Sequence, residues 1–192
     1  MKQTIKNLFG IISFAIVLPL IVITRGGMVF RSYNAFSFLS KLLSLLPGIT
    51  GVYIRRAYYG HTIPECGKNL TIEFGSFFSK PNVIIGDNVY IGAYCIIGNA
   101  EIGNNTLIAS RVSILSGSKQ HMDLTKTATA IRKEPIYEKI SIGDNCWIGE
   151  GAILMNNIGN DSIIGAGSVV VKEFGNSITA AGNPAKTIIK RS

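Results

Sequence analysis

The sequence predicts an all-β fold, a parallel β-helix of about five coils with one excursion loop, preceded by an apolar helical N-terminal segment. The prediction depends on a repeat of about six residues in which glycine or alanine usually follows an aliphatic residue. Neither the helical period nor the strict alternation of a strand matches this repeat, and it is typical of solenoids. The repeated aliphatic residues are Ile85, Ile91, Ile97, Ile102, Ile108 and Ile114, then Ile142, Ile148, Leu154, Ile158, Ile164 and Val170.

A small or β-branched residue usually stands two places before each aliphatic residue, as at Val83, Val89 and Cys95. Because side chains alternate across a strand, both members of such a pair face the interior of the coil. The glycine that follows is expected to supply an unusual backbone angle at a corner. Cys95 and Cys146 occupy small inward positions, and the three cysteines lack metal-ligand spacing. We therefore interpret both as structural and expect a reducing compartment.

The spacing also indicates how many coils there are and where they are interrupted. At about 18 residues per coil, residues 66–172 give about five coils. The repeat lapses between Gly117 and Lys139, which predicts the single excursion loop.

Residues 1–60 differ from the rest of the chain in charge and hydropathy. They contain seven Lys or Arg residues and no acidic residue, and the whole chain has a net charge of +8. Residues 8–24 form a run of seventeen residues without a charge. We therefore expect two domains, a membrane-associating helical segment over residues 1–60 and the β-helix over residues 61–192.

Three interpretations of residues 8–24 remain open. The run is short for a simple spanning helix, which needs about 20 apolar residues, and it contains Pro19. Basic residues flank both ends, which places both on the cytoplasmic face of the inner (cell) membrane. We favour a re-entrant or interfacial helix kinked near Pro19 over a spanning helix or a segment buried in protein. A cleaved signal peptide is disfavoured because the sequence after Thr24 offers a poor cleavage site.

The pattern of residues 28–46 predicts one amphipathic helix, with Phe38 and Leu42 on its apolar face, that ends at Pro47. This helix either packs on the end of the β-helix or lies among lipid headgroups. The lack of acidic residues and the basic residues nearby favour the membrane surface. Nucleic acid is not expected as a partner, because the basic residues are interleaved with long apolar runs. The basic residues in question are Arg31, Lys41, Arg55 and Arg56.

Three motifs follow the excursion in order. They are Trp147-Ile148-Gly149, then Gly165-Ala166-Gly167-Ser168-Val169-Val170, then Gly182-Asn183-Pro184-Ala185-Lys186. Together with the repeat, they resemble the hexapeptide-repeat, left-handed β-helix acyltransferases over about residues 66–190. The resemblance is closest to sugar O-acetyltransferases of the maltose and galactoside acetyltransferase type and of polysaccharide gene clusters.

The resemblance implies a left-handed coil, a homotrimer, and acetyl-CoA as co-substrate between subunits, with no metal. The backbone around Gly165, Ala166, Gly167 and Ser168 would line the pantetheine arm. The nucleotide end would meet Asn183, Pro184, Ala185 and Lys186. From the residues alone, glycine and alanine permit close approach of a ligand to backbone, and a lysine suits a phosphate. Trp147 is expected to face outward at the site or a subunit seam, because the interior of the coil is too narrow for an indole.

The excursion carries the candidate catalytic residue, His121. The resemblance places the family's catalytic histidine in such a loop, after a similar Ser/Gly-rich approach. The chemistry requires a base, because an alcohol loses its proton as it attacks a thioester, and imidazole titrates near the working pH. Asp123 and Glu150 are the candidates for orienting this histidine, and the sequence does not choose between them.

The leading hypothesis is an acetyl-CoA-dependent sugar O-acetyltransferase whose acceptor is a membrane-bound, lipid-linked saccharide for a surface polysaccharide. A sugar N-acyltransferase, a serine acetyltransferase-like enzyme and a non-enzymatic membrane-tethered scaffold are the alternatives. Serine acetyltransferases carry a large polar helical domain before the β-helix, which residues 1–60 do not resemble. A γ-class carbonic anhydrase needs three histidine ligands for zinc, and this chain has two histidines.

Overall fold

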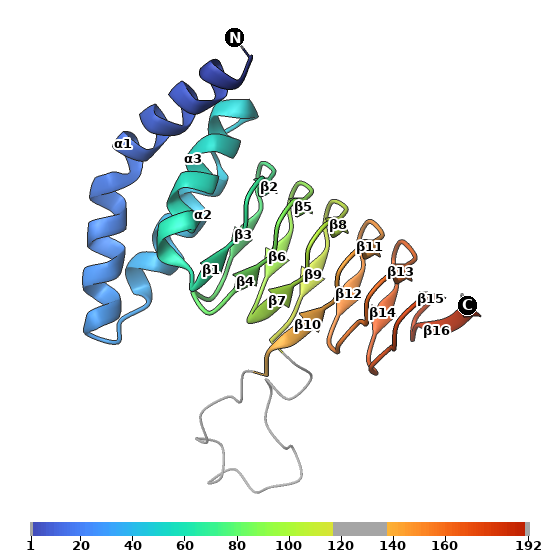
Figure 1. The fold of residues 1–192 in the computed structure, drawn as a ribbon. Coiled ribbons are helices and arrows are strands. Elements are labelled where there is room, and N and C mark those ends of the chain that lie inside the picture. The colour runs from blue at the N-terminus through green and yellow to red at the C-terminus, as the bar shows by residue number, and fades with distance from the viewer. Residues whose placement is uncertain (1, 117–137, 191–192) are drawn as a thin grey trace, which may run out of the picture.

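The computed structural model describes residues 2–116 and 138–190, with side chains from residue 8 onward. Three helices precede a β-solenoid whose far end carries the C-terminus (Figure 1). The helices are α1 (Lys2–Val29), α2 (Asn34–Ser44) and α3 (Gly48–Thr62). The strands are β1 (Glu65–Cys66), β2 (Thr71–Ile72), β3 (Phe77–Phe78), β4 (Ile84–Ile85), β5 (Tyr90–Ile91), β6 (Ile96–Ile97), β7 (Ala100–Ile102), β8 (Leu107–Ile108), β9 (Ser113–Ile114), β10 (Ile140–Ile142), β11 (Trp147–Ile148), β12 (Ile153–Leu154), β13 (Ile163–Ile164), β14 (Val169–Val170), β15 (Ile178–Ala181) and β16 (Lys186–Lys190).

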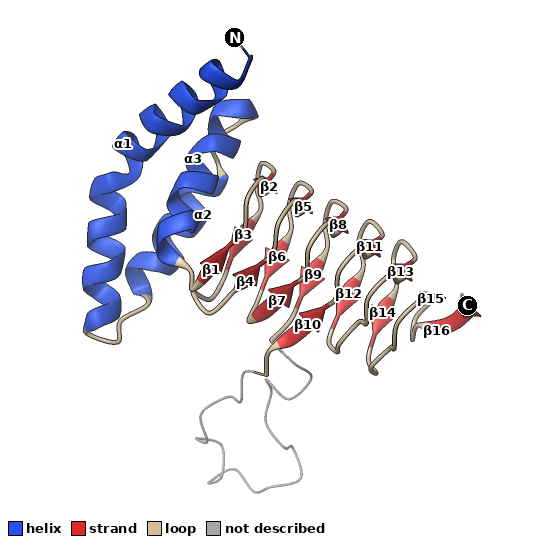
Figure 2. Cartoon of the chain, viewed as in Figure 1, coloured by secondary structure: helices blue, strands red, loops and turns tan. Residues whose placement is uncertain are grey.

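The strands form three sheets, and the chain visits each sheet in turn. The first sheet is ordered β1-β4-β7-β10, the second β2-β5-β8-β11-β13-β15-β16, and the third β3-β6-β9-β12-β14. Neighbouring strands are parallel except for β15 and β16, which are antiparallel. Figure 2 shows the short strands joined by turns at every corner. The prediction of a parallel β-helix of about five coils is confirmed, and the predicted excursion falls between β9 and β10, outside the described residues.

Stacked aliphatic side chains fill the interior of the coils, as the repeat predicted. Ile91, Ile108 and Ile148 are fully buried at successive levels of the second sheet. Cys95 and Cys146 are buried as well, with Sγ donating to Ala109 O and Gly159 O, each over 3.1 Å. Burial raises the pKa of the Cys95 thiol, so it stays protonated and unreactive. The structural interpretation of both cysteines is confirmed.

The corners between the first and second sheets depend on glycine for a different reason from the one expected. The left-handed backbone angle falls two residues later, on Asn88 or Asn105, where φ is +57° or +56°. Asparagine tolerates this region better than most residues. Gly86 is needed for close approach, because a Cβ there would lie 2.8 Å from the backbone nitrogen of Asn104 in the next coil.

The amides at these corners form a ladder along the solenoid. Each side-chain Nδ2 donates to the Oδ1 of the next coil over 3.0–3.2 Å. Such ladders satisfy the exposed amides and fix the register of the coils. The ladder runs through Asn69, Asn88, Asn105, Asn145 and Asp161.

The helical cap, formed by α1, α2 and α3, covers the first coil. The rings of Tyr59 and Phe78 lie 4.3 Å apart, and Ser40 Oγ donates to Phe78 O over 2.8 Å. Arg55 is fully buried, with Nε donating to Ile72 O over 2.9 Å. The interpretation of Arg55 as a membrane-facing cation is therefore wrong, because its guanidinium donates hydrogen bonds to backbone carbonyls inside the protein.

The helix predicted over residues 28–46 is divided in the structure. The chain turns between Val29 and Asn34, and Arg31 has a φ of +55°, which interrupts helical geometry. Phe38 and Leu42 of the predicted apolar face are 65% and 47% exposed, so this face does not pack on the coil. The buried face is Phe36, Leu39, Ser40, Leu43 and Ser44. The hydroxyls of the two serines donate hydrogen bonds to backbone carbonyls, which lowers the cost of burying them. A hydropathy pattern does not reveal such bonds.

Candidate functional site

Two of the predicted motifs meet at one corner near the end of the solenoid. Residues 165–168 turn the chain from β13 into β14, and residues 182–185 connect β15 to β16. Val169 N donates to Gly182 O over 3.0 Å, and Ala185 N donates to Val169 O over 2.8 Å. A Cβ on Gly165 would lie 2.7 Å from the Cβ of Ala181. Through Val169, which directly follows residues 165–168, these contacts bring residues 165–168 and 182–186 into one surface.

Within this surface, the predicted residues divide into exposed and supporting ones. Ala166, Gly167, Asn183, Pro184 and Lys186 are exposed, so a ligand can reach them. The supporting residues are Gly165, which is partly buried, and Ser168 and Ala185, which are buried. Ser168 Oγ accepts a hydrogen bond from Gly182 N over 3.2 Å and so fixes the backbone. The Asn183–Pro184 peptide bond is cis.

Trp147 lies one coil before this corner. It is 55% exposed on the outer face of β11, in register with Leu107 on β8 and Ile163 on β13. The prediction that the indole faces outward is confirmed. The turn after β11 stacks on the corner motif, since Gly167 N donates to Glu150 O over 2.8 Å. Trp147 and residues 165–186 therefore belong to adjacent levels of one edge.

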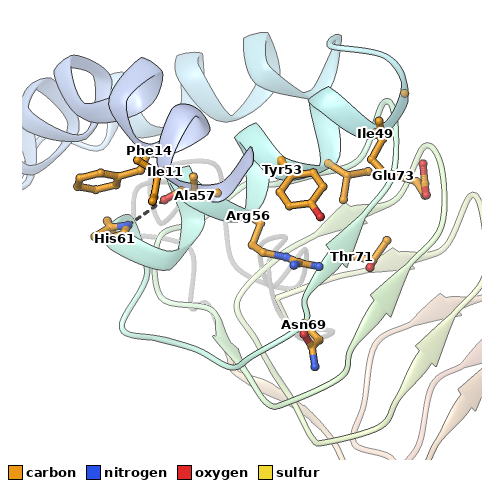
Figure 3. Close-up of a pocket in the computed structure, with 13 residues that line it drawn as sticks. Ile11, Phe14, Ile49, Tyr53, Arg56, Ala57, His61, Asn69, Thr71 and Glu73 are labelled. Carbon is orange, nitrogen blue, oxygen red and sulfur yellow. Dashed lines mark hydrogen bonds between the residues drawn. The ribbon is translucent and has the colours of Figure 1, made fainter. Parts of the chain in front are cut away.

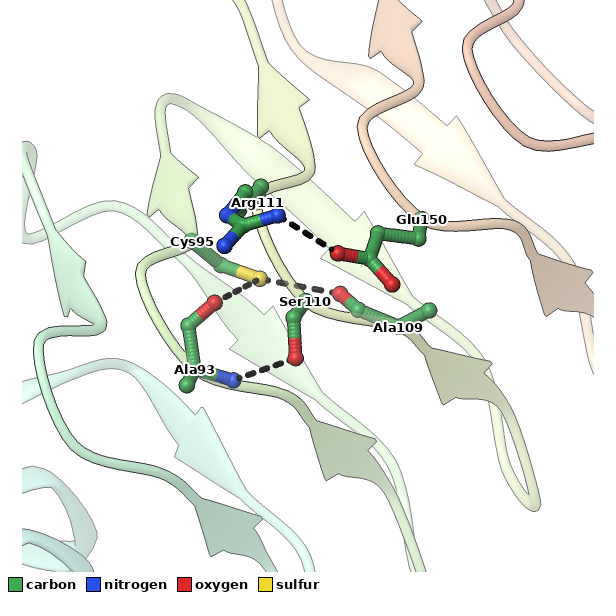
Figure 4. Close-up of polar contacts among 6 residues, drawn as sticks. All are labelled: Ala93, Cys95, Ala109, Ser110, Arg111 and Glu150. Atoms are coloured by element: carbon green, nitrogen blue, oxygen red, sulfur yellow. Dashed lines mark hydrogen bonds and ion pairs between the residues drawn. The ribbon is translucent and has the colours of Figure 1, made fainter.

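An ion pair lies on the same edge and was missed by the sequence analysis. Arg111 Nη1 donates to Glu150 Oε1 over 3.0 Å, and both side chains are largely exposed (Figure 4). The backbone at Arg111 has a φ of +59°, and Ser110 Oγ beside it accepts from Ala93 N over 3.2 Å. A charged residue in place of a small corner residue is the signal in the sequence that could have identified Arg111.

Glu150 has a partner that the sequence analysis did not identify. Its carboxylate contacts Arg111, whereas His121 and Asp123 lie outside the described residues. The roles expected of these three residues therefore stay predictions. An exposed ion pair contributes at most about 1 kcal/mol, so Glu150 is free to exchange partners at little cost.

Comparisons with known proteins concern the repeat and the fold. Residues 81–117 match the family described as bacterial transferase hexapeptide (six repeats), and residues 139–172 match the hexapeptide repeat of succinyl-transferase. A proposed acetyltransferase of Dictyostelium discoideum is 40% identical over 112 residues, 56% of this chain and 57% of that protein. The match thus spans little more than half the length of this relative.

Two solved structures share the fold over most of the chain. A maltose O-acetyltransferase from Clostridium difficile 630 is 26% identical with a TM-score of 0.69, covering 82% of this chain and 85% of that one. A galactoside acetyltransferase in complex with coenzyme A is 28% identical with a TM-score of 0.67, covering 80% of each chain.

The three-sheet coil and its six-residue repeat define a β-solenoid of the hexapeptide class. Within that class, the chain matches hexapeptide repeats over residues 81–117 and 139–172 and is similar to acetyltransferases of that kind, in agreement with the sequence resemblance.

Proposed function

We propose that the protein is an acetyl-CoA-dependent O-acetyltransferase that acts on a sugar hydroxyl. The observation that carries this proposal is the joining of residues 165–168 to residues 182–186 beside Trp147. The surface offers exposed backbone at Ala166 and Gly167 and a cation at Lys186. Support comes from the galactoside acetyltransferase, which was solved with coenzyme A and has the same fold over 80% of this chain.

In the proposed reaction, His121 acts as the general base. It removes the proton of the acceptor hydroxyl as the oxygen attacks the acetyl carbonyl. The new carbon–oxygen bond forms, the carbon–sulfur bond of the thioester breaks, and the departing CoA sulfur takes up the proton. Incubation with acetyl-CoA and free, lipid-linked or amino-bearing saccharides, or serine, tests the proposal through CoA release. Transfer to serine or only to amines would favour an alternative, and no transfer to any acceptor would favour a scaffold.

Charge reversal at Lys186 tests the proposed coenzyme site. We expect Lys186→Glu to weaken CoA binding several-fold and to leave acceptor saturation nearly unchanged, because a carboxylate would repel the CoA phosphates. Isothermal titration at low and high salt provides the measurement, and the effect should shrink at high salt, which screens exposed charges. Lys190→Glu, at the other end of β16, is the matched control. Equal binding by both variants and the parent would remove Lys186 from the site.

We also propose that the protein is a homotrimer. Exposed apolar side chains occupy both faces that meet at the edge, and contiguous exposed apolar surface is typical of an interface. Tyr90, Leu107 and Trp147 lie on the second sheet, and Ile96 and Ile153 on the third. Multi-angle light scattering in detergent gives the subunit number, and a monomer would contradict the proposal.

We propose that the protein attaches to a membrane through α1, because the exposed face of this helix is more apolar than its buried face. The helix is apolar and long enough to cross a membrane from Leu8 to Val29. Its buried stripe toward α3 is Ser13, Val17, Ile21 and Thr24. Two of these four residues carry hydroxyls, whereas the exposed face carries Ile11, Ile12, Ile16, Leu18, Val22 and Ile23. A helix whose outer face is more apolar than its inner face suits contact with lipid.

The contacts of α1 favour an orientation in the membrane plane over a spanning one. Phe9 stacks on Tyr53 with ring centroids 5.7 Å apart, and Arg25 Nε donates to His61 O over 2.7 Å. These contacts hold α1 against α3 along most of its length, so a spanning α1 would bring the polar groups of α3 into the hydrocarbon. We therefore propose that the helical cap lies on the cytoplasmic face, where acetyl-CoA is available. Figure 1 shows α1 bent along its continuous length, and Pro19 lies within it.

Acidic substitutions on the outer face of α1 test this attachment. We expect Ile16→Glu combined with Val22→Glu to lower partition onto vesicles at least about a hundredfold, since two apolar side chains would no longer be buried. Flotation of the full chain with phosphatidylcholine vesicles measures it. The control is Ile188→Glu, a similarly exposed residue on β16 at the opposite end. Unchanged flotation of the double variant would place the attachment elsewhere.

A further inference from the structure

An open groove of about 1390 Å³ lies between α1, α3 and the first coil, away from the edge that carries the coenzyme motifs. Its walls differ in chemistry from one end to the other (Figure 3). Ile11 and Phe14 of α1 line one end, and Arg56, Asn69 and Thr71 line the other. The groove therefore has an apolar end and a polar end.

Arg56 gives the polar end of the groove a positive charge. Its Nε donates to Leu70 O over 2.5 Å, and its guanidinium lies 5.7 Å from the ring centroid of Tyr53. Within residues 8–116 and 138–190, the ion pair between Arg111 and Glu150 does not involve Arg56, and no ion pair joins Arg56 to a carboxylate of this part of the chain. Glu73 also lines the groove, and Figure 3 shows Thr71 between it and Arg56. The Nη groups of a half-buried guanidinium thus face a groove, in the geometry that suits a phosphate.

The apolar end of the groove is continuous with the proposed membrane surface. Ile11 is 67% exposed and belongs both to the outer face of α1 and to the groove wall. Phe14 contacts the His61 ring with centroids 4.8 Å apart, which closes the groove beside α3. An amphiphile that enters from the bilayer would keep its chain on apolar side chains while its polar group advances toward Arg56.

We propose that this groove is a binding site for one phosphate-bearing membrane lipid. The lipid phosphate binds the guanidinium of Arg56, with Asn69 and Thr71 beside it, and the adjoining chain lies along Ile11 and Phe14. The proposal rests on the proposed attachment to membranes and adds a specific lipid site to it. Such a site would fix the helical cap at one depth and one orientation on the bilayer.

The test is a titration of full-length protein in a neutral detergent with short-chain phosphatidic acid, read by native mass spectrometry. We expect Arg56→Gln to weaken binding about tenfold or more, because a charged hydrogen bond is lost while glutamine still offers a donor to Leu70 O. Thr71→Glu should weaken binding similarly by placing a carboxylate beside Arg56. Lys41→Gln removes an exposed cation of α2 outside the groove and is the control.

The outcomes separate this site from general attraction and from the membrane attachment. Equal weakening by Lys41→Gln and Arg56→Gln, or equal binding of diacylglycerol, would overturn the site. Displacement of the lipid by millimolar inorganic phosphate would also overturn it, because the apolar chain would then contribute nothing. Flotation on phosphatidylcholine vesicles should persist in Arg56→Gln. Loss of flotation in the parent protein would contradict the attachment, whereas the titration in detergent reports on the groove independently.

Discussion

Replacement of His121 by alanine is expected to lower the rate of acetyl transfer about 10²–10⁴-fold, the usual effect of losing a general base. The acceptor hydroxyl would then have to lose its proton to water during attack on the thioester. CoA affinity and subunit assembly should stay close to those of the parent, because the proposed coenzyme surface lies on residues 165–168 and 182–186. Steady-state rates with saturating acetyl-CoA and a responsive acceptor measure the effect.

His61 provides a matched control, because the chain has two histidines. It lies at the end of α3, where its Nδ1 is 2.9 Å from Ala57 O. His61→Ala should transfer acetyl groups at nearly the parent rate. Retention of most activity by His121→Ala would remove this residue from the mechanism, and equal loss in both variants would indicate damage to the fold.

The largest loss of stability is expected for Arg55→Leu. Nη1 of Arg55 donates to Leu43 O over 3.0 Å and to Leu46 O over 2.8 Å, while its Nε serves Ile72 O. Leucine would fill part of the space and leave three carbonyls of α2, its following turn and β2 without this donor. We expect the free energy of unfolding to fall by about 3–5 kcal/mol, as when one partner of a buried polar network is removed. Chemical denaturation of the full chain in detergent gives the value.

Arg55→Lys and Lys68→Leu sharpen that test. A single ammonium cannot reproduce the forked geometry of guanidinium, so Arg55→Lys should be intermediate. Lys68 is exposed, and its replacement should change stability by no more than about 0.5 kcal/mol. Faster proteolysis within α1–α3 of Arg55→Leu would show that the helical cap has detached from the first coil. A loss below about 1 kcal/mol would mean that water replaces the guanidinium.

The coil and the motifs of the proposed coenzyme surface could be recognised in the sequence because their signals are local. Each short strand places an aliphatic residue such as Ile148 inward by alternation, and each corner repeats the same small residues. Trp147 faces outward for the same reason. The sequence did not show that Ser168 and Ala185 support the surface from inside, because that depends on contacts between coils.

The sequence by itself determined the three-sided coil, its number of turns, the place of the excursion and the residues of the motifs. Only the tertiary structure decided which faces of α1 and α2 are buried, how Arg55 is used, and that Arg111 contacts Glu150. The physical reason is that a segment apolar on all sides contains no periodic signal for its inner face. The partners of a buried polar group are likewise set by neighbours distant in sequence, as Ser40 and Phe78 show.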